Sequence, residues 1–192
     1  MEEDQILFER LADLQNEPSN HERYKQQLLD AFPGEFPSGD LFFPDYSFDG
    51  SDEVDYLRSR GLFQDKKWFD VDFDQLYKSY IYFPCLTEAG DIYYLPTFLS
   101  YFWDLRHIDL EFGSHLMGYI DGSKFERELG SKESRIKYDY KKFESLTVEQ
   151  AKLVATFLVN VANLIPSYAY DSQQAQKALT NYWGKFLISS PE

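Results

Sequence analysis

Hydrophobic side chains recur at helical spacing along most of the chain. The strongest pattern runs from Val148 to Ile165, directly after the sequence Thr147-Val-Glu-Gln150. In that sequence the Thr147 hydroxyl can accept a hydrogen bond from the Gln150 amide while the Gln150 side chain reaches back, which is a capping box. The spacing therefore predicts a long central helix over residues 147–165.

Other segments show the same period together with their own start or stop signals. They cover residues 4–14, 20–32, 51–61, 73–80, 87–105 and 171–186. Asn20 and Thr87 are natural N-caps, and Pro96 either kinks its helix or restarts it. Taken together, the segments predict an all-α fold, a single-domain irregular bundle of about six to eight helices over residues 1–192.

Three stretches have a different character. Residues 33–50 hold three prolines, three glycines and five aromatic residues, which predicts an ordered loop that wraps the core. Residues 122–145 are rich in charge and predict an exposed segment. Residues 1–19 predict a peripheral N-terminal helix.

The net charge is −14, and it is unevenly distributed. Residues 1–74 carry 7 basic and 19 acidic side chains, whereas residues 122–142 carry 7 basic and 4 acidic ones. An acidic surface repels nucleic acid and attracts basic proteins through long-range steering. We therefore expect a basic protein as the partner and no direct binding to nucleic acid. The plain alternative is that the acidic charge only keeps the protein soluble.

The sequence shows no signal for secretion or for a membrane. The N-terminus lacks the basic and apolar regions of a signal peptide, and no apolar run approaches the ~20 residues of a spanning helix. Cys85 is the only cysteine, which excludes an intramolecular disulfide and suits a reducing compartment. We expect a cytoplasmic protein that does not contact a membrane.

Motifs for metal binding, cofactor binding and catalysis are incomplete. Asp45-x-Ser47-x-Asp49-Gly50 matches the first half of a calcium loop, but Tyr56 stands where a bidentate Glu is needed. The three histidines lack zinc spacing, and the chain has no P-loop, dinucleotide-binding motif or nucleophile elbow. We therefore expect no cofactor and no catalysis. A hydrolase that uses two of the 33 acidic residues as paired carboxylates stays open as an alternative.

Four motifs in order along the chain resemble a known family. They are Pro37-x-Gly39-Asp40, Tyr93-Tyr94-Leu95-Pro96-x-Phe98-Leu99, Leu146-Thr147-x-Glu149-Gln150 followed by Phe157-Leu158, and Ala178-Leu179-x-x-Tyr182-Trp183. Over residues 25–183 this order resembles a bacterial family of small acidic proteins known only as a domain of unknown function. The resemblance implies an all-helical fold without established chemistry, and it carries over no functional residue. Some families of this general kind are immunity proteins that neutralise a toxin.

Acidic and aromatic residues are interleaved in two parts of the acidic half. The contact residues that we predict there are Phe43, Asp45, Tyr46, Asp49, Trp68, Asp70, Asp72 and Asp74. Aromatic anchors prolong the life of a complex, and acidic charge speeds the encounter with a basic protein. The pattern favours a non-catalytic protein-binding module, above all an immunity or inhibitor protein that neutralises a toxin or another basic protein. An inhibitor that mimics DNA is a variant of this hypothesis.

Overall fold

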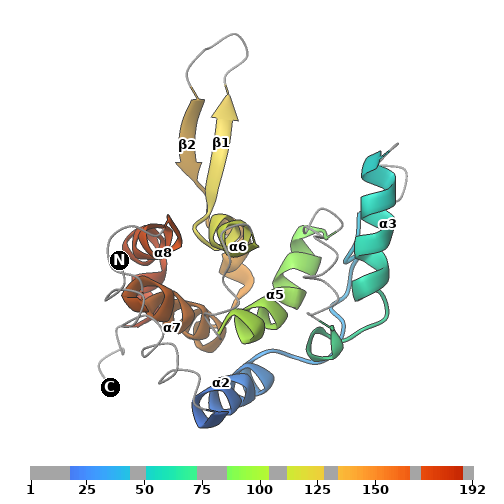
Figure 1. Ribbon diagram of the computed structural model, residues 1–192, viewed down its shortest axis with the longest axis horizontal. Helices are drawn as coiled ribbons and strands as arrows, with labels where there is room; N and C mark the ends of the chain where they lie inside the picture. The colour runs from blue at the N-terminus through green and yellow to red at the C-terminus, as the bar shows by residue number, and fades with distance from the viewer. Residues whose placement is uncertain are drawn as a thin grey trace, which may run out of the picture. The chain divides into compact units, whose positions relative to one another are not determined.

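The computed structural model describes residues 18–43, 51–72, 86–103, 112–127, 134–164 and 170–187 (Figure 1). The α-helices of this part are α2 (Pro18–Ala31), α3 (Ser51–Phe63), α5 (Glu88–Phe102), α6 (Phe112–Ile120), α7 (Val148–Leu164) and α8 (Tyr170–Asn181). The strands are β1 (Ser123–Arg127) and β2 (Ser134–Tyr138), and the 3-10 turns are η2 (Trp68–Asp70), η4 (Lys141–Ser145) and η5 (Trp183–Phe186). The all-α fold is confirmed, with six α-helices among the described residues. The helices predicted over 4–14 and 73–80 lie outside them.

The chain divides into two compact units. One is Glu22–Tyr101, and the other is Phe102–Glu192 together with Met1–His21. The acidic charge lies mostly in the first unit and in the residues before it: residues 22–101 carry 15 acidic and 7 basic side chains, and residues 102–192 carry 12 and 11. Residues 1–21, which belong to the other unit, add 6 acidic and 1 basic side chains, so both units carry a net negative charge. The single domain over residues 1–192 stays a prediction.

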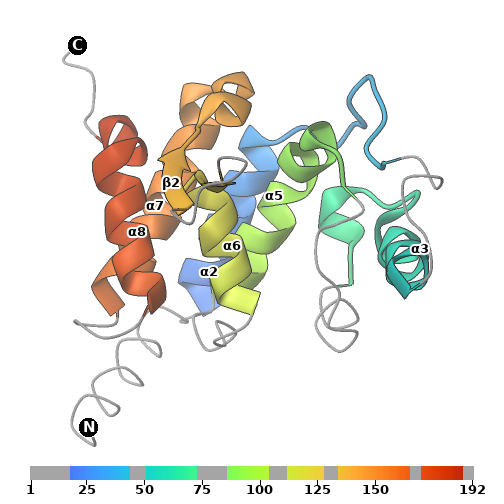
Figure 2. The same ribbon diagram turned by 90° about the horizontal axis from the view of Figure 1, so that it is seen from above.

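In the Phe102–Glu192 unit, α7 begins at the capping box that the sequence predicts. The Thr147 N–H donates to Gln150 Oε1 at 2.9 Å, and the Gln150 N–H donates to Thr147 Oγ1 at 3.2 Å. The buried face of the helix is formed by Ala151, Val154, Ala155, Phe157, Leu158 and Val161. Helix α8 lies beside α7 (Figure 2), and its buried residues Ala175 and Ala178 have side chains small enough for close packing. The long predicted helix is thus confirmed over Val148–Leu164.

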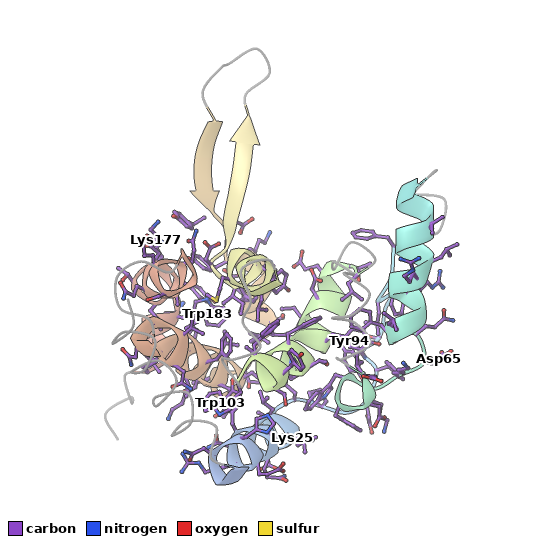
Figure 3. All side chains as sticks on the ribbon, viewed as in Figure 1. Lys25, Asp65, Tyr94, Trp103, Lys177 and Trp183 are labelled. Atoms are coloured by element: carbon purple, nitrogen blue, oxygen red, sulfur yellow. The ribbon has the colours of Figure 1, made fainter. Side chains whose placement is uncertain are left out.

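Trp183 joins η5 to α6 in the same unit. Its indole N–H donates to the Ile120 carbonyl at 3.0 Å, and its ring meets the ring of Phe143 at 4.9 Å (Figure 3). Tyr140 stacks on Tyr182, with ring centroids 4.4 Å apart and planes 4° from parallel. These aromatic contacts tie the turn η4 to the end of the chain.

The segment 122–145, predicted to be charged and exposed, contains two features that the sequence did not predict. Strands β1 and β2 pair antiparallel, with Ser123 opposite Tyr138, in a hairpin that follows α6 (Figure 1). In the turn η4, which follows the hairpin, the Phe143 side chain is 1% exposed and belongs to the core. The reason is that one aromatic ring among lysines and glutamates is sufficient to anchor a short turn, although it leaves no periodic signal in the sequence.

Helix α5 forms the core of the Glu22–Tyr101 unit. Thr87 caps it as predicted, since the Gly90 N–H donates to Thr87 Oγ1 at 3.2 Å. The helix continues through Pro96 as one element, so the alternative of a restart at this proline is wrong. Residues 93–99 are all buried, and this burial offsets the backbone hydrogen bond that Pro96 cannot donate.

Helix α2 and the loop after it also belong largely to this unit. The helix begins at Pro18, a residue suited to the first helical position, and so Asn20 is not its N-cap. Tyr24, Leu28 and Phe32 are buried, as the spacing predicts. Residues 33–43 are non-helical, in agreement with the predicted loop, and residues 44–50 lie outside the described part.

Candidate protein-binding surface

The structure describes four of the eight predicted contact residues. Phe43 is 42% exposed, Asp70 and Asp72 are exposed, and Trp68 is 1% exposed. The other four, Asp45, Tyr46, Asp49 and Asp74, lie outside the described residues.

Trp68 does not lie on the surface, and this corrects its assignment as a contact residue. Its carbonyl accepts a hydrogen bond from Thr97 Oγ1 at 2.5 Å, and its ring packs edge-on against Phe69 at 5.3 Å. Alternating aromatic and acidic residues do not show which ring faces the core. Here Trp68, whose backbone is bonded to Thr97 of α5, is 1% exposed, whereas Phe69 is 40% exposed.

Two exposed phenylalanines lie beside a contact between Gly34 and Tyr93. The Tyr93 hydroxyl donates to the Gly34 carbonyl at 3.3 Å, and the Phe36 ring lies 5.3 Å from the Tyr93 ring. The Phe69 ring reaches the same place, because a Cβ added at Gly34 would stand 2.8 Å from Phe69 Cε1. Phe36 is 48% exposed, so two partly open rings come together here from separate segments.

The turn η2 is fastened to a buried helix. The Tyr94 hydroxyl, on α5 (Figure 3), lies within hydrogen-bond distance of the Phe63 carbonyl at 2.9 Å and the Lys66 carbonyl at 3.0 Å. Together with the bond from Thr97, these contacts fix the segment that carries Phe69. A surface that is rigid before binding loses less conformational entropy when a partner docks.

Negative charge is placed next to these rings. Burial raises the pKa of Tyr93, a backbone hydrogen bond with Trp68 lowers it, and the negative charge of Asp70 raises it further. Asp70 directly follows Phe69 in η2 and is exposed. The name aromatic–acidic patch is used below for five exposed side chains: Phe36, Phe69 and Asp70, together with Glu35 and Asp72, which are near them along the chain.

Phe43 has a different environment. The Tyr56 hydroxyl donates to the Phe43 carbonyl, and Arg60 Nη1 in turn donates to the Tyr56 hydroxyl at 3.2 Å. The Arg60 guanidinium also lies over the Phe42 ring, 5.6 Å from its centroid. These contacts connect Phe43 to α3, whereas Asp70 belongs to η2 and the residues of α5 that hold it.

The sequence prediction did not select Phe36. A signal for it exists, because Phe36 stands between Glu35 and Pro37 in a stretch with three prolines, where no helical face can bury the ring. What the sequence does not show is that Phe36 and Phe69, 33 positions apart, lie against the two partners of one hydrogen bond, Phe36 against Tyr93 and Phe69 against Gly34.

Neither a metal-binding cluster nor a membrane-spanning helix occurs in the described ranges. There, no three His, Cys, Asp or Glu side chains come together in a way that could hold a metal ion. None of the helices described is long and apolar enough to cross a membrane.

Comparison with protein families matches residues 45–187 to a family of unknown function (DUF6714). The matched range contains Phe69, Asp70 and Asp72, while Gly34 and Phe36 precede it. No curated protein and no solved structure matches the chain. The aromatic–acidic patch is thus built partly from matched residues and partly from a preceding loop.

Proposed function

The chain belongs to DUF6714, a family of unknown function, and we propose from its own surface that it is a non-catalytic protein-binding module. Its role would be to inhibit a basic protein, most specifically as an immunity protein that neutralises a toxin. The observation that supports this proposal most is the aromatic–acidic patch, where exposed rings and carboxylates lie on the turn η2, which α5 holds, and on the loop after α2.

The exposed rings are suited to act as anchors. Binding energy in protein interfaces is concentrated in a few residues, often aromatic ones, that fill pockets of the partner and exclude water. Phe36 and Phe69 are 48% and 40% exposed, so each has a buried side that fixes it and an open side that a partner could cover. Rings that are already oriented lose little freedom on binding.

The charge supports a basic partner. Residues 22–101 carry a net charge of −8, from 15 acidic and 7 basic side chains. Long-range attraction of this kind raises association rates by tenfold or more at low salt and fades as salt increases. Aromatic anchors would then slow dissociation. The two features together are what an inhibitor of a basic protein requires.

The test begins with the gene directly upstream, because immunity genes accompany the genes of their toxins. The upstream protein is produced alone and together with this chain, and host growth is followed. We expect growth arrest by the upstream protein alone and rescue by the pair. An upstream protein that is harmless, or toxic with no rescue, contradicts the immunity role.

Charge reversal then locates the surface. The double variant Asp70→Lys/Asp72→Lys should associate with the upstream protein about tenfold more slowly at low salt. The matched control, Glu144→Lys/Glu149→Lys, makes the same change in net charge at exposed positions of the other unit. Association rates are measured at several salt concentrations after melting curves have shown that both variants are folded. Equal rates for the two variants would mean that the patch is not the recognition surface.

A further inference from the structure

Phe69 already carries a cation in the free protein. The Lys67 ammonium lies 5.6 Å from the centroid of the Phe69 ring, within the range of about 6 Å in which a cation is attracted to an aromatic face. Lys67 is exposed, and its side chain makes no capping hydrogen bond to η2. At an exposed site such a contact is only slightly stronger than thermal energy, so the ammonium exchanges readily between the ring and water.

The same turn carries a carboxylate. The Asp70 N–H donates to the Lys67 carbonyl at 2.9 Å and closes η2, so that Lys67, Phe69 and Asp70 belong to one short, fixed segment. Asp70 is exposed. Its charge reaches Tyr93, whose pKa is raised first by burial and then also by Asp70, with the Trp68 backbone acting in the opposite direction. Because Phe69 and Asp70 are consecutive exposed residues of this closed turn, one short segment offers both an aromatic ring and a carboxylate.

We infer that Phe69 and Asp70 bind an arginine side chain of the basic partner, and that Lys67 competes with this arginine in the free protein. The inference rests on the proposed function and deepens it. A guanidinium is planar and weakly hydrated, so it can stack on the Phe69 ring while its N–H groups reach a carboxylate. The surplus of acidic side chains in residues 22–101 favours a positively charged occupant.

The experiment compares Lys67→Met with Lys66→Met in the full chain. Both variants remove one positive charge and keep a long apolar stem. Lys66 contacts no aromatic ring among the described residues, so only Lys67→Met removes the competitor from Phe69. The contact energy corresponds to a ratio of about 2–5 between the Lys67 ammonium on the Phe69 ring and the same ammonium in water. Removing this competitor should raise the affinity for an arginine ligand about three- to sixfold relative to the Lys66→Met control.

The probe is a short peptide with three arginines separated by glycines, and its reference is the same peptide with citrulline in place of arginine. Binding is followed by the NMR shifts of the backbone amides. We expect the arginine peptide to shift the amides of Lys67, Phe69 and Asp70 and the citrulline peptide to leave them in place. Phe69→Leu, which keeps apolar bulk against Trp68 but removes the aromatic face, should weaken binding several-fold.

Three results would overturn the inference. These are equal affinities of Lys67→Met and Lys66→Met, binding of the citrulline peptide at the same amides, and shifts spread over acidic residues away from η2. The proposed function is tested separately by growth rescue. If rescue occurs and the two lysine variants behave alike, the inhibitor role stands and the arginine site falls. If the arginine site is found and rescue fails, the arginine site stands and the immunity role falls.

Discussion

Replacing Gly90 with alanine should destabilise the Glu22–Tyr101 unit, although alanine is the better helix former. Gly90 lies in the first turn of α5. A Cβ built there would stand 2.2 Å from the Leu41 carbonyl oxygen and 3.1 Å from its carbon. Restoring a C···O separation of about 3.3 Å requires a relative movement of roughly 1 Å. Backbone atoms cannot rotate out of the way as the end of a side chain can.

The magnitude follows from what holds Leu41 in place. Its carbonyl accepts a hydrogen bond from the Thr87 N–H at 2.9 Å, Thr87 Oγ1 donates to the Asp40 carbonyl at 2.6 Å, and Phe42 forms a β-bridge with Leu86. Losing the first bond costs about 1–3 kcal/mol when its partners stay buried. Overpacking costs about another 1–3 kcal/mol. Subtracting the ~1 kcal/mol that alanine gains in helix propensity leaves a net loss of about 1–5 kcal/mol.

Gly61→Ala is the matched control. Gly61 lies inside α3, is exposed, and has nothing within 4 Å of the position of an added Cβ. The same chemical change should therefore stabilise the protein there by about 0.5–1 kcal/mol. Urea unfolding, followed by circular dichroism and tryptophan fluorescence, gives both free energies, and equal slopes would show that the same surface unfolds. A Gly90→Ala protein as stable as wild type would refute the close approach of α5 to Leu41.

Two further predictions concern the Phe102–Glu192 unit. Phe157 is 0% exposed on α7, so Phe157→Ala should lower the free energy of unfolding by ~3–5 kcal/mol in denaturant melts, and a loss below ~1 kcal/mol would contradict its burial. Burial raises the pKa of Tyr140 to about 12; the nearby Asn181 side chain opposes the rise, and the charges of Asp121 and Tyr138 add to it. The pKa of a tyrosine in the unfolded chain is about 10, so the folded state keeps the Tyr140 proton to higher pH. The contribution of Tyr140 to the free energy of unfolding is therefore complete below about pH 10 and is lost as the pH rises to about 12. Tyr140→Phe keeps the ring that stacks on Tyr182 and should make thermal midpoints fall less steeply over this pH window; an unchanged slope would contradict the assignment.

Several elements were determined by the sequence itself. The capping box at Thr147 and the cap at Thr87 were predicted correctly because each hydrogen bond joins residues only three positions apart. The burial of Phe157 follows from the spacing of apolar residues on one helix. Such features depend on local geometry, and the sequence specifies local geometry directly.

Other elements were decided by contacts between distant segments. Helix α5 continues through Pro96 because its neighbours bury the surrounding residues, although proline locally favours a break. The turn η4 is anchored by Phe143, whose ring packs against Trp183, 40 positions later. Neither outcome has a periodic signal that a reading of the sequence could use.

The candidate surface shows the same division. The excess of acidic residues in the first part of the chain, and with it the preference for a basic partner, can be read from the sequence. The exposure of individual rings cannot, because Trp68 and Phe69 are adjacent and both aromatic, yet only Trp68 is buried. The Thr97 and Tyr94 hydroxyls on α5 hold the backbone around η2, and in this arrangement the Trp68 ring lies in the core. Charge is a sum over residues and is complete in the sequence, whereas the exposure of a side chain depends on which other segment packs against it, and only the tertiary structure supplies that segment.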